Sequence, residues 1–372
     1  MSLQRKLKYA VLGIGRMGQR HALNVAFKSP RSELVAVCDP RASSLEWSEK
    51  ALPAEIGRFA DADKCLRDSG ADAVLIASET GQHAPLTIAS VKAGKHVLLE
   101  KPISIDLDTS RQVVNEVSQY PDLKVMVGFS RRFDESNREI KRMIDAGRLG
   151  QPHLVKSATN DQYDPSGFFV SYAAASGGIF VDCAIHDIDL ARWFLLPSPA
   201  NLTASSAVPT LNSTTTAKKE VKRVFALGHN ARHPELEKDG DVDNGIGIVE
   251  FENGGTLVVH VNRTMMHGHD CFTEVFGTES KVVVNGNPQL NRVEIRDAYG
   301  VRTESTPTYY ERFKEAFVTE VNEFTEVVLD NKPLPVTAVD ALEASKIAAA
   351  LTHSFRTGQP VHFDDQNEPI MV

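Results

Sequence analysis

The chain has 372 residues, of which 42% are hydrophobic and 24% are charged, which is the composition of a globular protein with two or three domains. Its net charge of −8, without a long run of lysine and arginine, argues against a nucleic-acid binder. No stretch approaches the roughly 18 apolar residues that span a membrane, and the N-terminal residues lack the apolar segment of a signal peptide, so we expect a cytoplasmic protein.

The first predicted elements enclose a glycine-rich turn. Residues 9–12 form an apolar run typical of a buried strand, and residues 17–27 have a helical pattern. Between them stand Gly13, Gly15 and Gly18, in the pattern G-x-G-x-x-G. A second apolar run, 34–38, ends in Asp39, about 20 residues after Gly18, as the dinucleotide-binding fingerprint requires. This context favours the fingerprint over a glycine turn without a ligand.

Each residue of this motif has a physical role in binding a dinucleotide. Gly13 allows the tight turn, Gly15 lets the backbone approach a pyrophosphate, and Gly18 lets the helix pack close to the sheet. Arg16 and Met17 lie in the same turn, where the helix N-terminus offers N–H groups to phosphates. Asp39 would accept hydrogen bonds from ribose hydroxyls and repel a 2′-phosphate, which favours NAD over NADP. Arg41 would weaken that preference, so NADP stays open.

Strand and helix patterns continue to alternate to about residue 129. They predict a Rossmann domain over residues 1–129 with a doubly wound parallel sheet. The further elements expected there are a helix over 42–52, a strand over 73–77, a helix over 85–93, a strand over 96–99, a helix over 107–118 and a strand over 125–128.

The pattern changes in the second part of the chain, which predicts an α+β domain over residues 130–372 with a large, mostly antiparallel sheet. A helix is expected over 134–147, strands over 153–159, 246–251, 256–263, 271–276 and 281–285, and helices over 310–330 and 338–357. The final helices are also candidates for packing back on the first domain. Because an open sheet leaves one face to cover, we expect a homodimer or homotetramer.

The segment 203–240 is polar, with several threonines followed by lysines and Arg223. We interpret it as a surface excursion from the sheet. The alternative is a loop that binds a partner, since long loops are often functional.

A lysine stands at the carboxyl end of a predicted strand of the parallel sheet, in the sequence Glu100-Lys101-Pro102. Ligands of open α/β sheets bind outside these strand ends, so Lys101 is expected near the nicotinamide end of the cofactor. Pro102 stiffens the turn that presents it, and the sequence leaves open whether the peptide is cis. Lys101 is a candidate for proton transfer, and the alternative is a solvated lysine.

A second constellation lies in residues 177–194. Asp182, His186 and Asp189 have the i, i+4, i+7 spacing of one face of a helix. Histidine is the usual acid or base near neutral pH, and Asp182 one turn earlier would orient it or bind a substrate hydroxyl. Asp187 is expected at the surface. The alternative is a satisfied core histidine with solvated aspartates.

Other candidates extend these sites. Those for the cofactor are Ser78, Glu79 and His83, in the loop expected after strand 73–77, together with Glu100. Those for the substrate are Arg132, Asn160 and His269. His83 could equally cap the next helix, and Arg132 could be solvated. The four cysteines lie far apart without a Cys-x-x-Cys pair, and we predict free thiols and no metal site.

Three segments in this order resemble the glucose–fructose oxidoreductase, inositol dehydrogenase and rhizopine catabolism (Gfo/Idh/MocA) family. They are G-x-G-x-x-G, residues 93–102, and the run from Gly177 through Asp182 to His186. The resemblance covers nearly the whole chain and is greatest to the inositol 2-dehydrogenase branch. It implies that Lys101 contacts the cofactor and the substrate hydroxyl, and that His186 exchanges the hydroxyl proton.

The resemblance further implies that Asp182 fixes the reacting hydroxyl and that Asp189 binds substrate. The chain departs from the inositol pattern in the long segment 203–240 and in two local sequences. The turn 267–270 has histidine where tyrosine is often seen, and Asn160-Asp161 stands where Arg-Asp is common. The polyol or sugar is therefore left open.

These observations predict an NAD-dependent dehydrogenase that oxidises a secondary hydroxyl of a cyclic polyol or sugar. One alternative is an aldose or glycoside dehydrogenase that uses NADP. Another is a non-catalytic, NAD-binding regulatory protein with 203–240 as its partner surface. A regulator has no need of a proton-transfer set, so Lys101, Asp182 and His186 argue against it.

Overall fold

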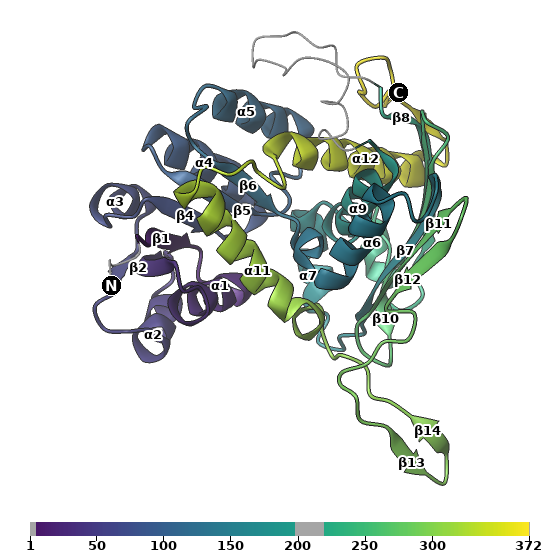
Figure 1. Ribbon diagram of the computed structural model, residues 1–372, viewed down its shortest axis with the longest axis horizontal. Coiled ribbons are helices and arrows are strands. Elements are labelled where there is room, and N and C mark those ends of the chain that lie inside the picture. Colours follow the sequence, from purple (N-terminus) through teal and green to yellow (C-terminus); the bar gives the residue numbers. More distant parts are fainter. Residues whose placement is uncertain (1–4, 198–218, 372) are drawn as a thin grey trace. The chain divides into compact units, whose positions relative to one another are not determined.

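A computed structural model describes residues 5–197 and 219–371 of the chain (Figure 1). The chain folds as two compact units, and α11 (Tyr309–Leu329) and α12 (Ala338–Thr357) each contribute to both. The first unit comprises the described residues up to Asp134 together with Phe313–Glu343, and the second comprises Glu135–Arg312 and the residues from Ala344 onward.

The first unit contains a parallel sheet with the strand order β3-β2-β1-β4-β5-β6. Strand order reverses between β1 and β4, which is where doubly wound sheets bind ligands. The strands are β1 Leu7–Leu12, β2 Ser32–Cys38, β3 Gly57–Phe59, β4 Ala73–Ile76, β5 His96–Glu100 and β6 Val125–Gly128. The helices are α1 Arg16–Phe27, α2 Ala42–Ala51, α3 Ala62–Asp68, α4 Thr80–Lys92, α5 Leu107–Ser118 and the 3₁₀ turn η1 Ser130–Phe133. The predicted Rossmann fold is confirmed.

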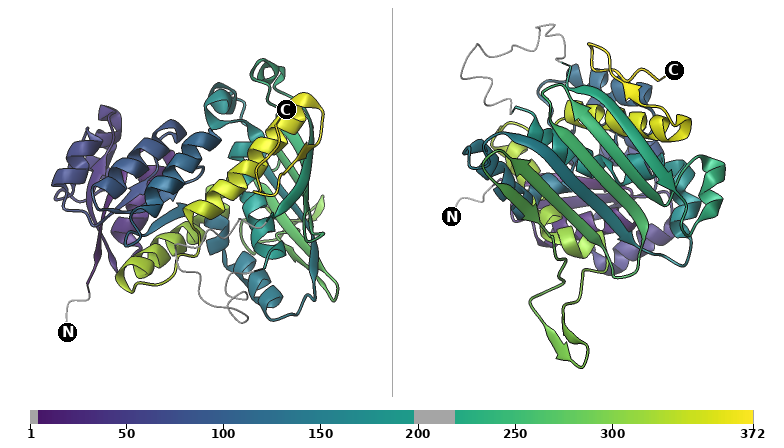
Figure 2. Two further views of the ribbon diagram at one scale, coloured as in Figure 1. Left: turned by 90° about the horizontal axis from the view of Figure 1, so that it is seen from above. Right: turned by 90° about the vertical axis from the view of Figure 1, so that its right-hand side faces the viewer.

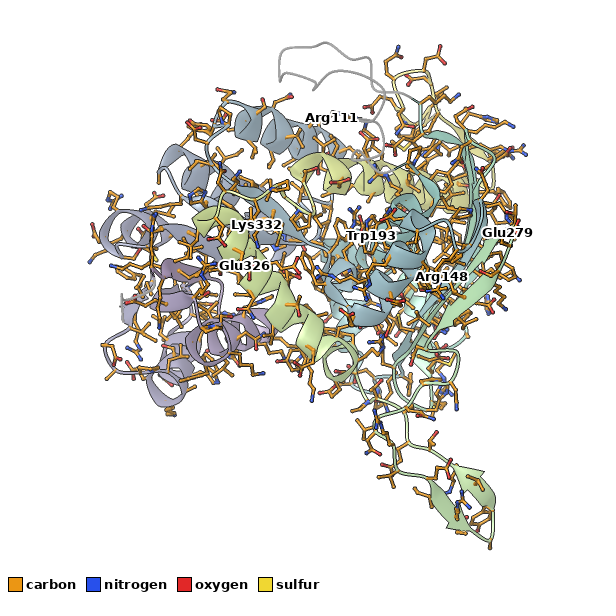
Figure 3. The ribbon with its side chains drawn as sticks, viewed as in Figure 1. Arg111, Arg148, Trp193, Glu279, Glu326 and Lys332 are labelled. Carbon is orange, nitrogen blue, oxygen red and sulfur yellow. The ribbon has the colours of Figure 1, made fainter. Side chains whose placement is uncertain are left out.

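The sheet strands are apolar because helices cover both faces of the sheet. All four residues of β4 are buried, as are the last four of β1. The 313–329 part of α11 also belongs to this unit. Its Thr325 contacts the hydroxyl of Tyr9 at 2.8 Å. Asp330, just beyond the helix, forms a bidentate ion pair with Arg31. Glu326 and Lys332 pair near the end of the same helix (Figure 3).

The second unit is built on a sheet with the strand order β12-β11-β7-β10-β9-β8-β15. The β7–β10 pair is parallel and the other pairs are antiparallel, which confirms the mostly antiparallel sheet. The strands are β7 Pro152–Gln162, β8 Val221–His229, β9 Asn244–Phe251, β10 Thr256–Met265, β11 Asp270–Gly277, β12 Lys281–Val284 and β15 Val361–His362. The helices are α6 Glu135–Asp145, α7 Phe168–Ser176, α8 Ile179–Asp182, α9 Ile185–Leu195 and the 3₁₀ turn η2 Pro234–Asp239.

Helices pack on one face of this sheet, and Figure 2 looks onto the other face in its right-hand view. On the covered face, α8 and α9 contact the central strands β9, β10 and β7. Trp193 of α9 is half-buried and stacks on Phe194 (Figure 3). Along β10, Leu257, Val259 and Val261 are buried at alternate positions, so these side chains point toward the covered face of the sheet.

The interpretation of 203–240 as a surface excursion is wrong for residues 221–229, which form β8, and residues 203–218 lie outside the described part of the chain. A register shift between Val221 and Arg223 breaks the alternation that identifies a strand. The basic residues there are explained by sheet pairing, because Lys222 and Arg223 both bond Glu250 of the neighbouring strand at 2.7 Å.

Between β12 and α11 the chain forms a further hairpin, β13 Ile295–Asp297 and β14 Gly300–Arg302, which the sequence did not predict (Figure 1). Its Tyr299 is 91% exposed. Across the two described ranges, 5–197 and 219–371, no helix has the length and apolarity needed to span a lipid bilayer.

Candidate functional site

The glycine turn between β1 and α1 is shaped by close backbone contacts. Gly13 has a positive φ of 87°, and a β-carbon at this position would lie 2.4 Å from the Cα of Ser78. A β-carbon on Gly18 would lie 1.8 Å from the carbonyl oxygen of Gly13. Only glycine therefore fits at either position. A β-carbon on Gly15 would meet only Arg41 Nη2, at 3.6 Å, so Gly15 is not required by the packing of the protein itself.

Gly15 is the N-cap of α1 and has no side chain to cap the helix. The first helical turn, which includes exposed Arg16 and half-buried Met17, directs its N–H groups toward this end of the helix, where anions bind. A glycine that the fold does not need, at a helix N-terminus without a side-chain cap, fits the approach of a pyrophosphate.

Asp39 follows β2 at the same edge of the sheet, and its side chain is 3% exposed. Its Oδ2 accepts a hydrogen bond from the Ile14 N–H at 2.7 Å, and its carboxylate pairs with the Arg41 guanidinium at 3.0 Å. Burial raises the pKa of Asp39, but the hydrogen bonds and charge of Arg41 and the Ile14 N–H outweigh it, so the pKa is lowered. The carboxylate is thus ionised and attached to the glycine turn.

Lys101 lies directly after β5, half-buried, and the Lys101–Pro102 peptide is cis. Glu100, the last residue of β5, accepts hydrogen bonds from the Lys101 N–H at 3.3 Å and from His21 Nε2 of α1 at 2.6 Å. Burial raises the pKa of Glu100, but the hydrogen bond from His21 and the charge of Lys101 outweigh it, so the pKa is lowered. The Glu100 carboxylate is therefore held inside the unit, beside the backbone that presents Lys101.

A second carboxyl group lies near Glu100. Glu320 of α11 is 1% exposed, and its Oε2 is buried without a hydrogen-bond partner among the described residues. Burial, and then the negative charge of Glu100, raise its pKa well above the usual value. The fold therefore favours the neutral form of the Glu320 carboxyl group. Glu320 was not predicted, because nothing local in the sequence of α11 distinguishes it.

His83 is not in a loop, as predicted, but in the first turns of α4, and it is buried. Its ring nitrogens contact the carbonyl oxygens of Pro102, at 2.7 Å, and of Ser78, at 3.2 Å. Burial lowers its pKa despite these contacts. The helix was predicted to begin at Pro85, but it begins five residues earlier, at Thr80. His83 thus connects the segment after β4, with half-buried Ser78 and exposed Glu79, to the segment after β5.

In the second unit, the helix predicted to carry Asp182, His186 and Asp189 on one face is interrupted, so the prediction of a single stripe is wrong. Asp182 ends α8, and α9 begins at Ile185. Asp182 and His186 are half-buried, whereas Asp189 is fully buried. The interruption lets the side chains of Asp182 and Cys183 both contact Arg263 of β10.

The prediction that Asp187 lies at the surface is also wrong. Asp187 is fully buried and accepts hydrogen bonds from Ser157 Oγ at 2.5 Å and from Thr159 Oγ1 at 2.6 Å. These two residues occupy inward positions of β7. Asp187 therefore attaches α9 to the sheet, since a buried carboxylate needs such partners.

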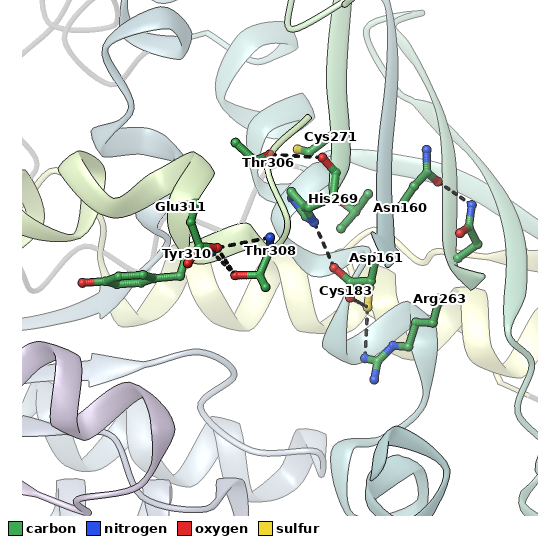
Figure 4. A network of polar contacts seen from close by, with 12 residues as sticks. Asn160, Asp161, Cys183, Arg263, His269, Cys271, Thr306, Thr308, Tyr310 and Glu311 are labelled. Carbon is green, nitrogen blue, oxygen red and sulfur yellow. Dashed lines mark hydrogen bonds and ion pairs between the residues drawn. The ribbon is translucent and has the colours of Figure 1, made fainter. Parts of the chain in front are cut away.

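Asp161, two residues further along β7, faces the same side and connects several groups of the second unit (Figure 4). Its Oδ1 accepts a hydrogen bond from His269 Nδ1 at 3.0 Å, and its Oδ2 lies 3.8 Å from Cys183 Sγ. Burial raises the pKa of Asp161, but the hydrogen bond from His269 and the charge of Arg263 outweigh it, so the pKa is lowered. His269 is protonated at neutral pH, because Asp161 raises its pKa to about 9 against the effect of burial.

Two predicted substrate residues make other contacts. Asn160 is buried and accepts a hydrogen bond from Asn262 at 2.7 Å, across the β7–β10 pair (Figure 4). Arg132 is 7% exposed, and its guanidinium lies 3.4 Å from the Pro335 carbonyl oxygen and 3.8 Å from an Asp340 carboxylate oxygen. Arg132 thus stabilises the first unit, whatever else it contacts.

Arg263 is the functional candidate that the sequence prediction missed. It follows Leu257, Val259 and Val261 in the alternation of β10, so its side chain faces the covered side of the sheet. The sequence did contain a signal for Arg263, which is a charged residue at an inward position of a strand. Such a residue is buried only when it has partners, so it indicates a polar cluster.

Family models match most of the chain. The model described as the oxidoreductase family with an NAD-binding Rossmann fold matches residues 7–129, and the Gfo/Idh/MocA C-terminal domain matches residues 137–283. The chain is 34% identical over 362 residues to scyllo-inositol 2-dehydrogenase (NAD(+)) of Bacillus subtilis, covering 97% of this chain and 98% of that protein. It is 29% identical to myo-inositol 2-dehydrogenase of Thermotoga maritima, covering 96% and 99%.

Solved structures agree with these matches. Scyllo-inositol dehydrogenase from Lactobacillus casei, with bound NAD(H) and scyllo-inositol, superposes with a TM-score of 0.86 at 31% identity, covering 96% of this chain and 99% of that one. Myo-inositol 2-dehydrogenase from Lactobacillus plantarum gives a TM-score of 0.86 at 30% identity, covering 97% and 100%. The predicted NAD cofactor is confirmed by these matches, in agreement with the glycine turn.

Proposed function

This chain belongs to the Gfo/Idh/MocA oxidoreductase family, and from that premise we propose that it oxidises a secondary hydroxyl of an inositol-like cyclic polyol. The predicted family and the enzyme class, an NAD-dependent oxidoreductase acting on CH–OH groups, are confirmed by the matches. The observation that carries the substrate proposal is the match, over nearly the full length of both chains, to an enzyme solved with NAD(H) and scyllo-inositol.

In the proposed reaction the ring C–H bond breaks, the C–O bond becomes a carbonyl, and the hydroxyl proton passes to the protein. NAD, when bound, supplies the acceptor for the hydride. We assign the hydroxyl proton to the imidazole of His186, with Lys101 as the ammonium that contacts the hydroxyl oxygen. Asp182 would hold the hydroxyl by accepting a hydrogen bond, and Asp189 is assigned to substrate binding.

The first unit supports the cofactor side of this proposal. The glycine turn, the helix N-terminus at Gly15 and the ionised Asp39 occupy one edge of the parallel sheet, and Lys101 follows β5 at that same edge. We assign Ser78, Glu79, His83 and Glu100 to the lining of the cofactor site. Their contacts support a role in holding the segments after β4 and β5.

The substrate side is proposed in the second unit, with Asp182, His186, Asn160 and His269, and Arg132 is assigned to it from the first unit. The support is the cluster around Asp161, in which the half-buried carboxylates of Asp161 and Asp182 are paired with cations. Such a cluster suits a neutral, hydroxyl-rich ligand, because the charges of the cluster are already balanced.

A screen of cofactors and substrates tests the function. The purified protein is given NAD or NADP with scyllo-inositol, myo-inositol, an aldose or a methyl glycoside, and reduced cofactor is followed by absorbance. We expect NADH formation with at least one inositol and slower reduction of NADP. Turnover of the aldose with NADP alone would establish the competing aldose dehydrogenase, and tight NAD binding without any turnover would contradict the proposal.

We also propose a homodimer or homotetramer that covers the outer face of the second sheet. Apolar side chains on that face are half exposed, among them Leu227, Ile246 and Ile248 at 58%, 49% and 44%. Leu227 and Ile246 are directly paired across β8 and β9. Light scattering of the wild type and of Ile248→Glu tests this, because a charge in a covered apolar face should shift the protein to a smaller species.

A cytoplasmic location is proposed as well. The four cysteines are buried free thiols, which fits a reducing compartment. Fractionation of the cells that produce the protein tests this.

A further inference from the structure

Arg263 carries a buried positive charge at the centre of the proposed substrate side. Its side chain is 12% exposed and forms an ion pair with Asp182, whose own side chain is 17% exposed. The same nitrogen, Nη2, lies 3.0 Å from Cys183 Sγ. The guanidinium also lies 5.1 Å from the centre of the Phe169 ring. Arg263 is thus enclosed by α7, by the break between α8 and α9, and by its own strand.

The charge of Arg263 is balanced by carboxylates and not by the thiol. Burial raises the pKa of Cys183 to about 12, so the thiol is neutral at physiological pH. Asp182 and Asp161 supply the negative charges, and Asp161 is shared with His269 (Figure 4). Because a buried guanidinium is costly without anionic partners, Arg263 and Asp182 constrain each other.

This constraint matters because Asp182 ends a short helix, α8, just before the interruption that precedes α9. A carboxylate there could rotate between several staggered rotamers. The ion pair uses one oxygen, Oδ2, and the rigid guanidinium fixes its direction. The carboxylate is thereby held ionised and in one orientation, as an acceptor of a substrate hydroxyl must be.

We propose that Arg263 is a positioning residue, which holds Asp182 ionised and oriented so that Asp182 can fix the reacting hydroxyl of the polyol. This inference rests on the proposed function, in which Asp182 contacts that hydroxyl. It assigns Arg263 no contact with substrate or cofactor.

A double-mutant cycle tests the proposal in the full-length protein. Arg263→Met keeps an apolar stem and removes the charge, and Asp182→Asn removes the other partner. We expect Arg263→Met to lower kcat/KM for the inositol roughly 10- to 100-fold, with the Kd for NAD within about twofold of the wild type. The kcat/KM of the double variant should be within about threefold of that of Asp182→Asn, because both changes remove the same interaction.

Two readouts separate positioning from a structural role. Arg263→Lys keeps the charge without the planar fork and should recover part of the lost activity. The acidic limb of the kcat/KM profile should move to higher pH in Arg263→Met, because Asp182 loses its cation. The other titratable groups near Arg263 are Asp161, Asp241, Cys183 and His269, and the proposed base His186 also shapes this limb. A shift that is absent when Arg263→Met is made in Asp182→Asn is therefore assigned to Asp182.

Arg232→Met is the matched control. Arg232 also lies over an aromatic ring, that of Tyr163 at 4.5 Å, but it is exposed and should leave kcat/KM unchanged. Two results would overturn the inference. One is a kcat/KM of the double variant that falls by the product of the two single losses. The other is a fall in kcat/KM of Arg263→Met that is no larger than its loss of folded protein. If the wild type oxidises no polyol, the proposed function fails by itself. The coupling of Arg263 and Asp182 is then still measurable in urea unfolding of the same four proteins.

Discussion

Two alanine substitutions in the glycine turn should have opposite effects. In Gly18→Ala the new β-carbon would lie 1.8 Å from the Gly13 carbonyl oxygen, so α1 and the turn must separate by about 1 Å or more. Overpacking of this kind costs about 1–3 kcal/mol and sometimes more. In Gly15→Ala the nearest atom is Arg41 Nη2 at 3.6 Å, an ordinary contact, and the φ of −82° is open to alanine.

For Gly15→Ala we expect a change in unfolding free energy within about 1 kcal/mol, because the weaker N-cap is offset by the lower entropy of the unfolded chain. The methyl group nevertheless lies where a pyrophosphate would approach, and we expect NAD affinity to fall at least about tenfold. Urea unfolding followed by circular dichroism measures the first quantity, and calorimetric titration with NAD measures the second.

Gly18→Ala should instead lower the free energy of unfolding. Any change in the NAD affinity of this variant should be a consequence of that loss of stability. Wild-type affinity for NAD in Gly15→Ala, or unfolding of Gly18→Ala at the wild-type urea concentration, would contradict these expectations. Either result would mean that the turn adjusts more freely than its contacts indicate.

Three further substitutions test cofactor selection, proton transfer and the buried carboxyl group of Glu320. Asp39→Ala should reduce the preference for NAD over NADP in kcat/KM, because the carboxylate that repels a 2′-phosphate is removed. Lys101→Ala should lower kcat roughly 100-fold or more while the Kd for NAD changes little. Glu320→Gln should make the protein more stable at pH 8 than the wild type, with little difference near pH 4. The raised pKa of Glu320 in the folded state means that its stabilising contribution is complete below about pH 4.3 and is lost as pH rises toward the folded pKa.

Each of these expectations has a clear contrary result. An unchanged NAD-to-NADP ratio in Asp39→Ala would remove Asp39 from cofactor selection. Full activity in Lys101→Ala would contradict the proton-transfer assignment. For Glu320, urea unfolding at the two pH values is decisive, since a difference between the proteins that does not grow with pH would show that the buried acid is ionised. Glu323→Gln, on the same helix and half-buried, serves as the matched control.

The cofactor side was predictable from the sequence because its geometry is local. The positive φ of Gly13 and the contact of Gly18 with the Gly13 carbonyl oxygen are set within one turn, and Asp39 is placed by the length of one βαβ unit. The predicted helix over 107–118 and the strand over 125–128 have the observed bounds. Even here, Glu320 was not predicted, because its partner Glu100 lies more than 200 residues earlier in the chain.

The second unit was less predictable because its contacts are distant in sequence. Arg263 and Asp182 are 81 residues apart, and nothing between Asp182 and Ile185 resembles a helix-breaking glycine or proline. The break in the helix is therefore a tertiary effect. Strand β8 was missed for a local reason, the bulge that removes its alternation. Asp187 was misplaced because its hydroxyl partners, Ser157 and Thr159, are specified only by the sheet.

Deuterium labelling of the polyol follows the hydride itself. The protein is incubated with NAD and an inositol deuterated at its ring carbons, and the reduced cofactor and the polyol product are examined by mass spectrometry. We expect NADH that carries a single deuterium and an inositol that has become a ring ketone. NADH without deuterium, or no reduced cofactor with either scyllo- or myo-inositol, would contradict this expectation.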